Sequence, residues 1–237
     1  MTEKSGFTPP AREIQSHLEE IEHHLTEELV PFWMTHGVDE EYGGFLTYFD
    51  RDGSPTGETV KTLICQTRMI YAFARAHLEG FGDGYFLEQA LQGARFVSRN
   101  FTDAVNGGYF WTVERDGTPR DRKKIVYGHS FVIYANAELL KASRDFTRRS
   151  ADTTALACLH ALDTFALDRK HGGFFEFFEE DWQHCQPGVY GGDRKSLDVH
   201  MHLMEAFTNW CDATADWREP TVSRSEEHTS ELQSRQS

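Results

Sequence analysis

The chain has 237 residues and a formal net charge of −14 at pH 7. That length suits one large domain or two small ones, and an aromatic content of 13% argues against intrinsic disorder. The acidic balance disfavours a nucleic acid or an anionic membrane as partner, because both need a basic face. The charge does not argue against a neutral ligand such as a sugar.

The four cysteines are scattered, and none forms a CxxC pair: Cys65, Cys158, Cys185 and Cys211. This usage favours the reducing cytoplasm and argues against a zinc site. Residues 1–10 are polar, and we expect a flexible N-terminus that is not a signal peptide. No stretch is apolar enough to predict a membrane span, and no nucleotide-binding or zinc-protease motif occurs. The sequence thus predicts neither a cofactor nor a metal.

Three similar segments recur along the chain and reveal internal repeats. Each opens with a Gly-Gly pair, whose first glycines are Gly43, Gly107 and Gly172, spaced 64 and 65 residues apart. Aromatic residues follow the glycines, and an Asp-Gly pair ends the first two segments. We expect short hairpins here. Because Asp181-Trp182 stands in place of the last Asp-Gly, we expect a different turn in the third segment.

Helical patterns flank every hairpin. A polar helix with one apolar stripe precedes it, and in the first unit the stripe has helical spacing: Ile14, Leu18, Ile21, Leu25 and Leu29. A more apolar helix follows each hairpin, over 61–78, 124–141 and 195–212. Because a helix that is apolar on most sides must be enclosed by others, each unit reads as outer helix, hairpin, inner helix. Three units, over 11–79, 84–145 and 151–213, predict an all-α array of six alternating helices.

Polar residues fall in register on the inner helices when these are aligned on Lys61, Lys124 and Lys195. Positions three and seven after the lysines share one helical face and hold four polar side chains: Arg68, Tyr127, Asp198 and His202. Such groups are costly to bury without partners, so they predict a pocket for a polar ligand. A structural ion pair for the arginine, a packed tyrosine and a core histidine remain alternatives. His200 and His202 face different directions on a helix, which disfavours a shared metal.

Four segments resemble the N-acylglucosamine 2-epimerase family, which includes cellobiose 2-epimerases and mannose isomerases. They are LVPFWMTHGVDEEYGGFLTYFDRDG (29–53), KTLICQTRMIYAFARAH (61–77), YGHSFVIYANAELLKAS (127–143) and KSLDVHMHLMEAFTNW (195–210). The resemblance implies an (α/α)6 barrel, of which this chain holds the N-terminal half. It also implies abstraction of the C2 proton of an open-chain sugar through an enediolate, which yields either the epimer or the ketose.

The resemblance also implies roles for individual residues. Arg68 matches an arginine at the oxygens of the substrate's carbonyl end, and Tyr127 matches a tyrosine that lines the site. His202 matches the second histidine of an H-x-H motif near the reacting carbons, and with Arg68 it is the catalytic candidate. His200 and Asp198 are expected to bind substrate. Because Asp198 replaces the asparagine usual in cellobiose epimerases, the sugar stays open among mannose, glucose, an N-acylglucosamine and a disaccharide such as cellobiose.

The domain organisation predicted is a partial barrel over 11–217 and a disordered tail over 218–237. The string RSEEHTSELQS (224–234) resembles the translation of a sequencing adapter, so we expect the tail to be an artefact. With the second half of the ring missing, we expect the 237-residue chain to be inactive by itself. Two other functions stay open, a glycoside hydrolase or lyase on the same barrel and a non-catalytic αα-repeat protein. The sequence leaves the oligomeric state undetermined.

Overall fold

The computed structural model describes residues 11–143 and 147–215. The expected flexible N-terminus (1–10) and the expected artefactual tail (218–237) lie outside these residues. Within them, no helix has the length and apolarity needed to cross a membrane.

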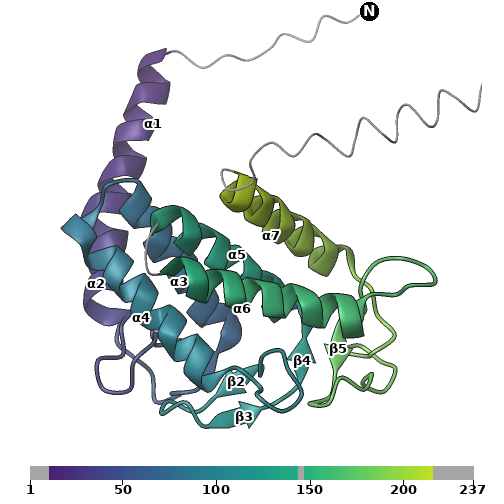
Figure 1. The fold of residues 1–237 in the computed structure, drawn as a ribbon. Helices are drawn as coiled ribbons and strands as arrows, with labels where there is room; N and C mark the ends of the chain where they lie inside the picture. Colours follow the sequence, from purple (N-terminus) through teal and green to yellow (C-terminus); the bar gives the residue numbers. More distant parts are fainter. Residues whose placement is uncertain (1–10, 144–146, 216–237) are drawn as a thin grey trace, which may run out of the picture.

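Outer and inner helices alternate along the chain, as the repeats predict (Figure 1). The outer helices are α1 (Ala11–His23), which continues through a π-helical segment η1 (His24–Leu29) into α2 (Val30–His36), then α4 (Tyr85–Asn100), and α6 (Thr147–Ala161) with a second π-helical segment η3 (Leu162–Ala166). A short 3-10 turn η2 (Gly82–Gly84) precedes α4. The inner helices are α3 (Leu63–Leu78), α5 (Val126–Ala142) and α7 (Leu197–Ala215). They lie side by side, with α5 packed between α3 and α7.

Short strands connect neighbouring units, where the sequence predicts only separate hairpins. They are β1 (Lys61–Thr62), β2 (Thr112–Val113), β3 (Pro119–Asp121), β4 (Lys124–Ile125) and β5 (Phe177–Phe178). One antiparallel sheet has the order β1-β2-β3, and the other pairs β4 with β5. The extended residues that precede the inner helix of one unit thus pair with the hairpin of the next, which fixes each unit against its neighbour.

The inner helices begin two residues later than the sequence predicts. Lys61 and Lys124 belong to strands β1 and β4, and α7 starts at Leu197, just after Lys195. Each lysine reaches the Gly-Gly loop of its own unit instead of packing along its helix. The three lysines therefore occupy equivalent positions in their units, as the alignment assumes, although none of them lies in a helix.

Each of these lysines forms an ion pair with an aspartate that precedes the Gly-Gly pair by four residues. Lys61 Nζ lies 2.8 Å from Asp39 Oδ2, Lys124 Nζ lies 2.7 Å from Asp103 Oδ2, and Lys195 pairs with Asp168. The first two pairs are buried and the third is partly exposed. Burial by itself raises the pKa of Asp103, but the Lys124 ammonium and backbone N–H donors outweigh it and lower that pKa to about 2.

The side chain at the fifth position after each lysine also binds the Gly-Gly loop, by accepting a backbone N–H from the residue that follows the glycines. His129 Nε2 accepts the N–H of Tyr109 at 3.0 Å, and Gln66 Oε1 accepts that of Phe45 at 2.8 Å. These are the residues that follow the two glycines, which both have left-handed backbone in every unit. A side chain at Gly108 would also collide with His129 and Trp182, so glycine is needed there for space as well as conformation.

The prediction of a different turn in the third hairpin is wrong. Trp182 adopts a φ of 66°, in the same left-handed region as Gly53 and Gly117, and the turn makes the same backbone hydrogen bonds as in the second unit. A non-glycine residue in this region costs roughly 1–2 kcal/mol. Packing offsets that cost, because the buried indole stacks on Phe165 at 5.1 Å and donates Nε1–H to the Asn106 carbonyl at 3.1 Å.

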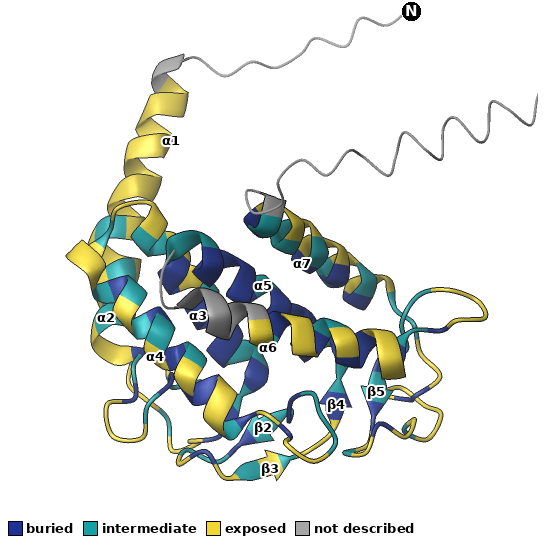
Figure 2. Cartoon of the chain, in the orientation of Figure 1, coloured by how far each residue is buried: buried dark blue, intermediate teal, exposed yellow. Residues whose placement is uncertain are grey.

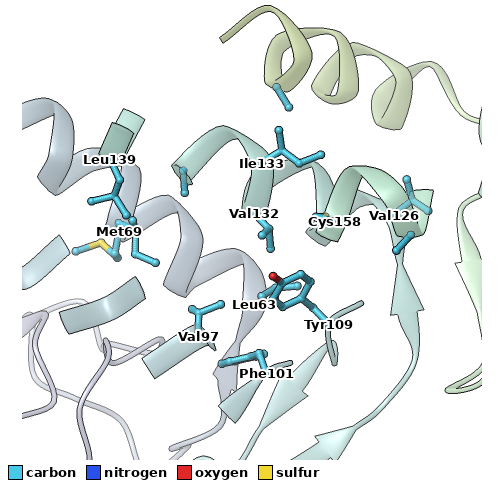
Figure 3. Close-up of a cluster of buried hydrophobic side chains, with 14 of the residues drawn as sticks. Leu63, Met69, Val97, Phe101, Tyr109, Val126, Val132, Ile133, Leu139 and Cys158 are labelled. Carbon is cyan, nitrogen blue, oxygen red and sulfur yellow. The ribbon is translucent and has the colours of Figure 1, made fainter. Parts of the chain in front are cut away.

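The hydrophobic core lies between the inner helices and the outer helices α4 and α6 (Figures 2 and 3). Helix α5 is buried on most sides, as its apolar sequence predicts. Helix α1 differs from expectation, because its apolar stripe is exposed along its whole length. The periodicity correctly predicts the helix, but its apolar face finds no inner helix among the described residues.

The buried His129 makes the fold sensitive to acid. Burial lowers its pKa to about 4, so between this value and the ordinary 6.5 the unfolded chain binds the proton first and stability falls as the pH falls. The loss should reach roughly 2 kcal/mol between pH 7 and pH 5. His129→Gln keeps an acceptor, as Gln66 does in the first unit, and should remove this component in urea titrations at both pH values. Equal pH dependence in the two proteins would contradict this assignment.

Candidate functional site

The face shared by the third and seventh positions after the lysines turns toward one centre. Arg68 of α3 donates Nη2–H to the hydroxyl of Tyr127 on α5 at 3.2 Å. The Arg68 guanidinium also lies over the ring of Phe131, 4.5 Å from its centroid. The arginine is therefore held by an aromatic face and a phenol, with its remaining N–H groups free of protein carboxylates that would neutralise it among the described residues.

His202 of α7 completes the cluster from the opposite side. Its ring centroid lies 5.1 Å from that of Tyr127 and 4.9 Å from that of Phe131. Its Nδ1 lies 2.9 Å from Glu205 Oε2, and its Nε2 lies 3.6 Å from Asp198 Oδ1. A neutral imidazole that donates Nδ1–H to Glu205 presents Nε2 as a base, so the carboxylate selects the tautomer.

A cleft of about 610 Å³ opens beside this cluster, at the hairpin ends of α5 and α7. Tyr127 and Asp198 line it and connect it to the cluster. Its other walls combine aromatic rings with polar groups, including Trp111, Asp121, Glu176 and Tyr190. Aromatic walls with a few convergent polar groups are typical of small-molecule sites.

The tenth position after the lysines extends the same face, and the alignment of the inner helices missed its two tyrosines, although the spacing of Glu205 from His202 does predict that these two residues are neighbours. It holds Tyr71, Tyr134 and Glu205, and the two tyrosine rings stack at 4.3 Å. Burial and the nearby Tyr71 raise the pKa of Tyr134. The sequence does contain this information, because the tenth position lies three residues after the seventh and therefore continues the same helical face.

His200 is the candidate that the structure does not bring into the cluster. Its Nε2 accepts the N–H of Phe174 at 2.9 Å, and its Nδ1 donates to the Ser196 carbonyl at 2.7 Å. Both ring nitrogens thus bind backbone, as those of His129 do in the second unit. The residue corresponds to His129 and Gln66, which hold the Gly-Gly loops.

A buried carboxylate that the helix alignment could not reveal also lines the cleft. Glu176 belongs to the third hairpin, is buried, and accepts the N–H of Ser196 at the start of α7. It comes from outside the inner helices, which is why their alignment misses it. Among residues 11–143 and 147–215, no group of His, Cys, Asp and Glu has the arrangement of a metal site.

Comparison with known proteins places these features in a family. The family model described as N-acylglucosamine 2-epimerase matches residues 43–229. The cellobiose 2-epimerase of Dictyoglomus turgidum is 29% identical over 201 residues, which cover 83% of this chain and 50% of that protein. The D-mannose isomerase of Marinomonas mediterranea is 29% identical over 194 residues, covering 82% and 45%. The chain spans about half the length of the curated relatives it matches.

Solved structures give the same result for the fold. The structure of the cellobiose 2-epimerase from Spirochaeta thermophila superimposes with a TM-score of 0.77 at 31% identity, covering 88% of this chain and 52% of that one. A family 76 mannosidase from Bacteroides thetaiotaomicron, at 12% identity and a TM-score of 0.62, shares the fold alone. The alternating helices are thus half of an (α/α)6 barrel, as predicted. This chain belongs to the N-acylglucosamine 2-epimerase family.

Proposed function

We propose that this chain supplies the carbonyl-binding half of a sugar 2-epimerase or aldose–ketose isomerase. The observation that carries the proposal is the cluster of Arg68, Tyr127 and His202 at the edge of the cleft. Removal of the C2 proton from an open-chain sugar places negative charge on the oxygens of C1 and C2. A fixed guanidinium and a phenolic O–H directed at those oxygens lower the barrier.

The roles of the other residues follow from their contacts. His202 lies within reach of a ligand beside Tyr127, and its Nε2 is suited to exchange a proton with a sugar hydroxyl or with a reacting carbon. Asp198, which is exposed and lines the cleft, is suited to accept hydrogen bonds from sugar hydroxyls. We assign His200 to the Gly-Gly loop rather than to direct contact with substrate, because both of its ring nitrogens are occupied.

The substrate class is a neutral sugar. The net charge of −14 suits such a ligand better than a polyanion. The names of the relatives support cellobiose and mannose as the sugars to test first. The four cysteines are all free thiols, which is typical of proteins of the reducing cytoplasm, and the names of the relatives support a role in carbohydrate metabolism.

Two measurements test the proposal. The first titrates the 237-residue chain with a hexitol, an open-chain polyol that cannot react, and follows binding by ligand-observed NMR; the Arg68→Ala variant should not bind. The second uses a longer protein, in which this chain is extended past Asp216 along its genomic reading frame. It follows the incorporation of deuterium at C2 of mannose and cellobiose in D₂O. Exchange at C2 supports the proposal. Release of a reducing sugar from a glycoside without C2 exchange would instead favour the hydrolase alternative, for which Glu176 and Asp198 are two of the carboxylates that line the cleft.

A further inference from the structure

One buried carboxylate of the cleft is stabilised differently from the others in the molecule. The other buried carboxylates of residues 11–143 and 147–215 each form an ion pair with a lysine or an arginine: Asp39, Asp103, Glu138 and Asp168. Glu176 is 3% exposed and has no such partner within the same two ranges. Because a buried charge is costly without compensation, its remaining contacts must supply that compensation.

Both the backbone and the side chain of Glu176 bind the start of an inner helix. Its carbonyl accepts the N–H of Val126, the first residue of α5, at 3.0 Å. Its carboxylate oxygen Oε1 accepts the N–H of Ser196, which directly precedes α7 and caps that helix by accepting the Val199 N–H at 3.3 Å. A carboxylate in this place also faces the positive end of the helix dipole. One residue of the third hairpin thus holds the first turns of two neighbouring inner helices.

The side-chain contact is specific to the third unit and is not part of the repeat. The position four residues after the first glycine of each pair holds Thr47 in the first unit and Trp111 in the second. The Trp111 carbonyl accepts the N–H of Leu63 at the start of α3, as the Glu176 carbonyl does at the start of α5. The Trp111 side chain has no acceptor, and the Thr47 hydroxyl accepts no helix N–H in the described part of the chain. The repeat therefore forms without this contact, which points to a local role in the third unit.

The two helix starts that Glu176 holds carry two of the site residues. Tyr127 is the second residue of α5, and Asp198 is the second residue of α7. Both line the cleft, as Glu176 does. The Tyr127 hydroxyl accepts the N–H of Arg68, and Asp198 Oδ1 lies 3.6 Å from His202 Nε2. A shift of either first turn would therefore change the distance between the groups that meet a ligand.

We propose that Glu176 is a positioning residue of the sugar site, which fixes Tyr127 and Asp198 relative to each other. The inference rests on the proposed function, because it requires that these two side chains bind the substrate. Since Glu176 acts through the two helix starts, the reach of its side chain and its acceptor oxygen matter more than its charge.

Substitutions at Glu176 separate reach from charge. Each variant of the 237-residue chain is titrated with a hexitol by ligand-observed NMR, and its circular dichroism spectrum reports folding. Glu176→Gln keeps the length and an acceptor oxygen, and its affinity should stay within about threefold of the unmodified chain. Glu176→Asp keeps the charge but is one methylene shorter, and Glu176→Leu has no acceptor. Both should lose at least about tenfold in affinity, and the comparison of Gln with Asp suffices if the Leu variant does not fold.

The matched control is Glu180→Leu, which removes a neighbouring carboxylate that binds Arg122 and is 42% exposed. Its affinity for the hexitol should equal that of the unmodified chain. A double-mutant cycle then tests the route: Glu176→Asp should weaken binding less in a chain that already carries Asp198→Ala, because that chain has no carboxylate left to position. A general loss of stability would instead weaken binding equally in both backgrounds.

The outcomes distinguish this role from the proposed function itself. A Glu176→Asp chain that binds the hexitol as well as the unmodified chain would overturn the positioning role alone. So would a Glu176→Gln chain as weak as Glu176→Asp, which would indicate direct contact between the charge and the ligand, or equal effects in the two backgrounds of the cycle. An unmodified chain that does not bind the hexitol would overturn the proposed function, and the positioning role with it.

Discussion

Replacing Lys124 with methionine is expected to lower the free energy of unfolding by about 3–5 kcal/mol. The Lys124 side chain is 0% exposed, and its ammonium lies 2.7 Å from Asp103 Oδ2, itself almost fully buried. Methionine retains much of the volume of the side chain but leaves the Asp103 carboxylate as an uncompensated buried charge. Urea titration at pH 7 measures the loss.

Two controls separate charge from packing. Lys195→Met removes the equivalent ion pair of the third unit, in which the lysine is 24% exposed. The loss in the free energy of unfolding should therefore be smaller. Combining Lys124→Met with Asp103→Asn removes the unpaired charge and should restore part of the stability. If the single and double variants were equally destabilised, the ion pair would not be the cause.

Acid should reproduce part of this effect. The pKa of Asp103 in the fold is about 2, below its ordinary value near 4, so its contribution is complete above pH 4 and disappears as the pH falls toward 2. The Lys124→Met chain lacks the partner that holds this pKa down. It should therefore lose less stability than the unmodified chain over that range.

The Arg68→Ala substitution is expected to reduce C2 exchange in an active, longer chain by at least about 100-fold, which is the usual effect of removing one donor to a developing oxyanion. Arg68 is exposed, and its side-chain hydrogen-bond and ring contacts among the described residues are those with Tyr127 and Phe131. Stability should therefore change little. Deuterium exchange at C2 gives the rate, and thermal unfolding gives the stability.

The matched control is Arg120→Ala, which removes a half-exposed arginine of the second hairpin that approaches only Glu58 and Glu114 at 3.9 and 3.7 Å among the described residues. It should leave C2 exchange unchanged. Arg68→Lys keeps the charge but loses the planar fork, and we expect an intermediate rate. If Arg68→Ala exchanged the C2 proton at the unmodified rate, the role proposed for this arginine would be wrong.

The sequence predicts the helical plan and the inward face well, because both depend on local periodicity. Apolar residues on most sides of 124–141 require an enclosed helix, and α5 is enclosed. The three lysines mark equivalent positions, so the third and seventh residues after them share a face in every unit. Counting along the chain from these lysines is enough to group Arg68, Tyr127 and His202.

What the sequence could not predict depends on partners distant in the chain. The spacing shows that Asp39, Asp103 and Asp168 each precede a Gly-Gly pair, but only the fold reveals that lysines 21 to 27 residues later bind them. Trp182 occupies a glycine position because packing overrides its backbone preference. The stripe of α1 has the right period for a buried face, and periodicity carries no information about which surface would bury it.

The hairpin contacts between units run in one direction. Arg115 of the second hairpin binds Asp39 in the first loop through two hydrogen bonds of 2.9 Å, and Trp182 of the third hairpin donates to Asn106 in the second loop. The first two loops are thus each contacted by the hairpin of the next unit. We therefore expect loss of the Trp182 contact to loosen the 103–108 loop, which Lys124 and His129 still hold, whereas loss of the Arg115 contact should leave the third hairpin intact. The third hairpin thus contributes to the order of the loop in the unit before it, and substitutions at Trp182 should raise amide exchange in that loop.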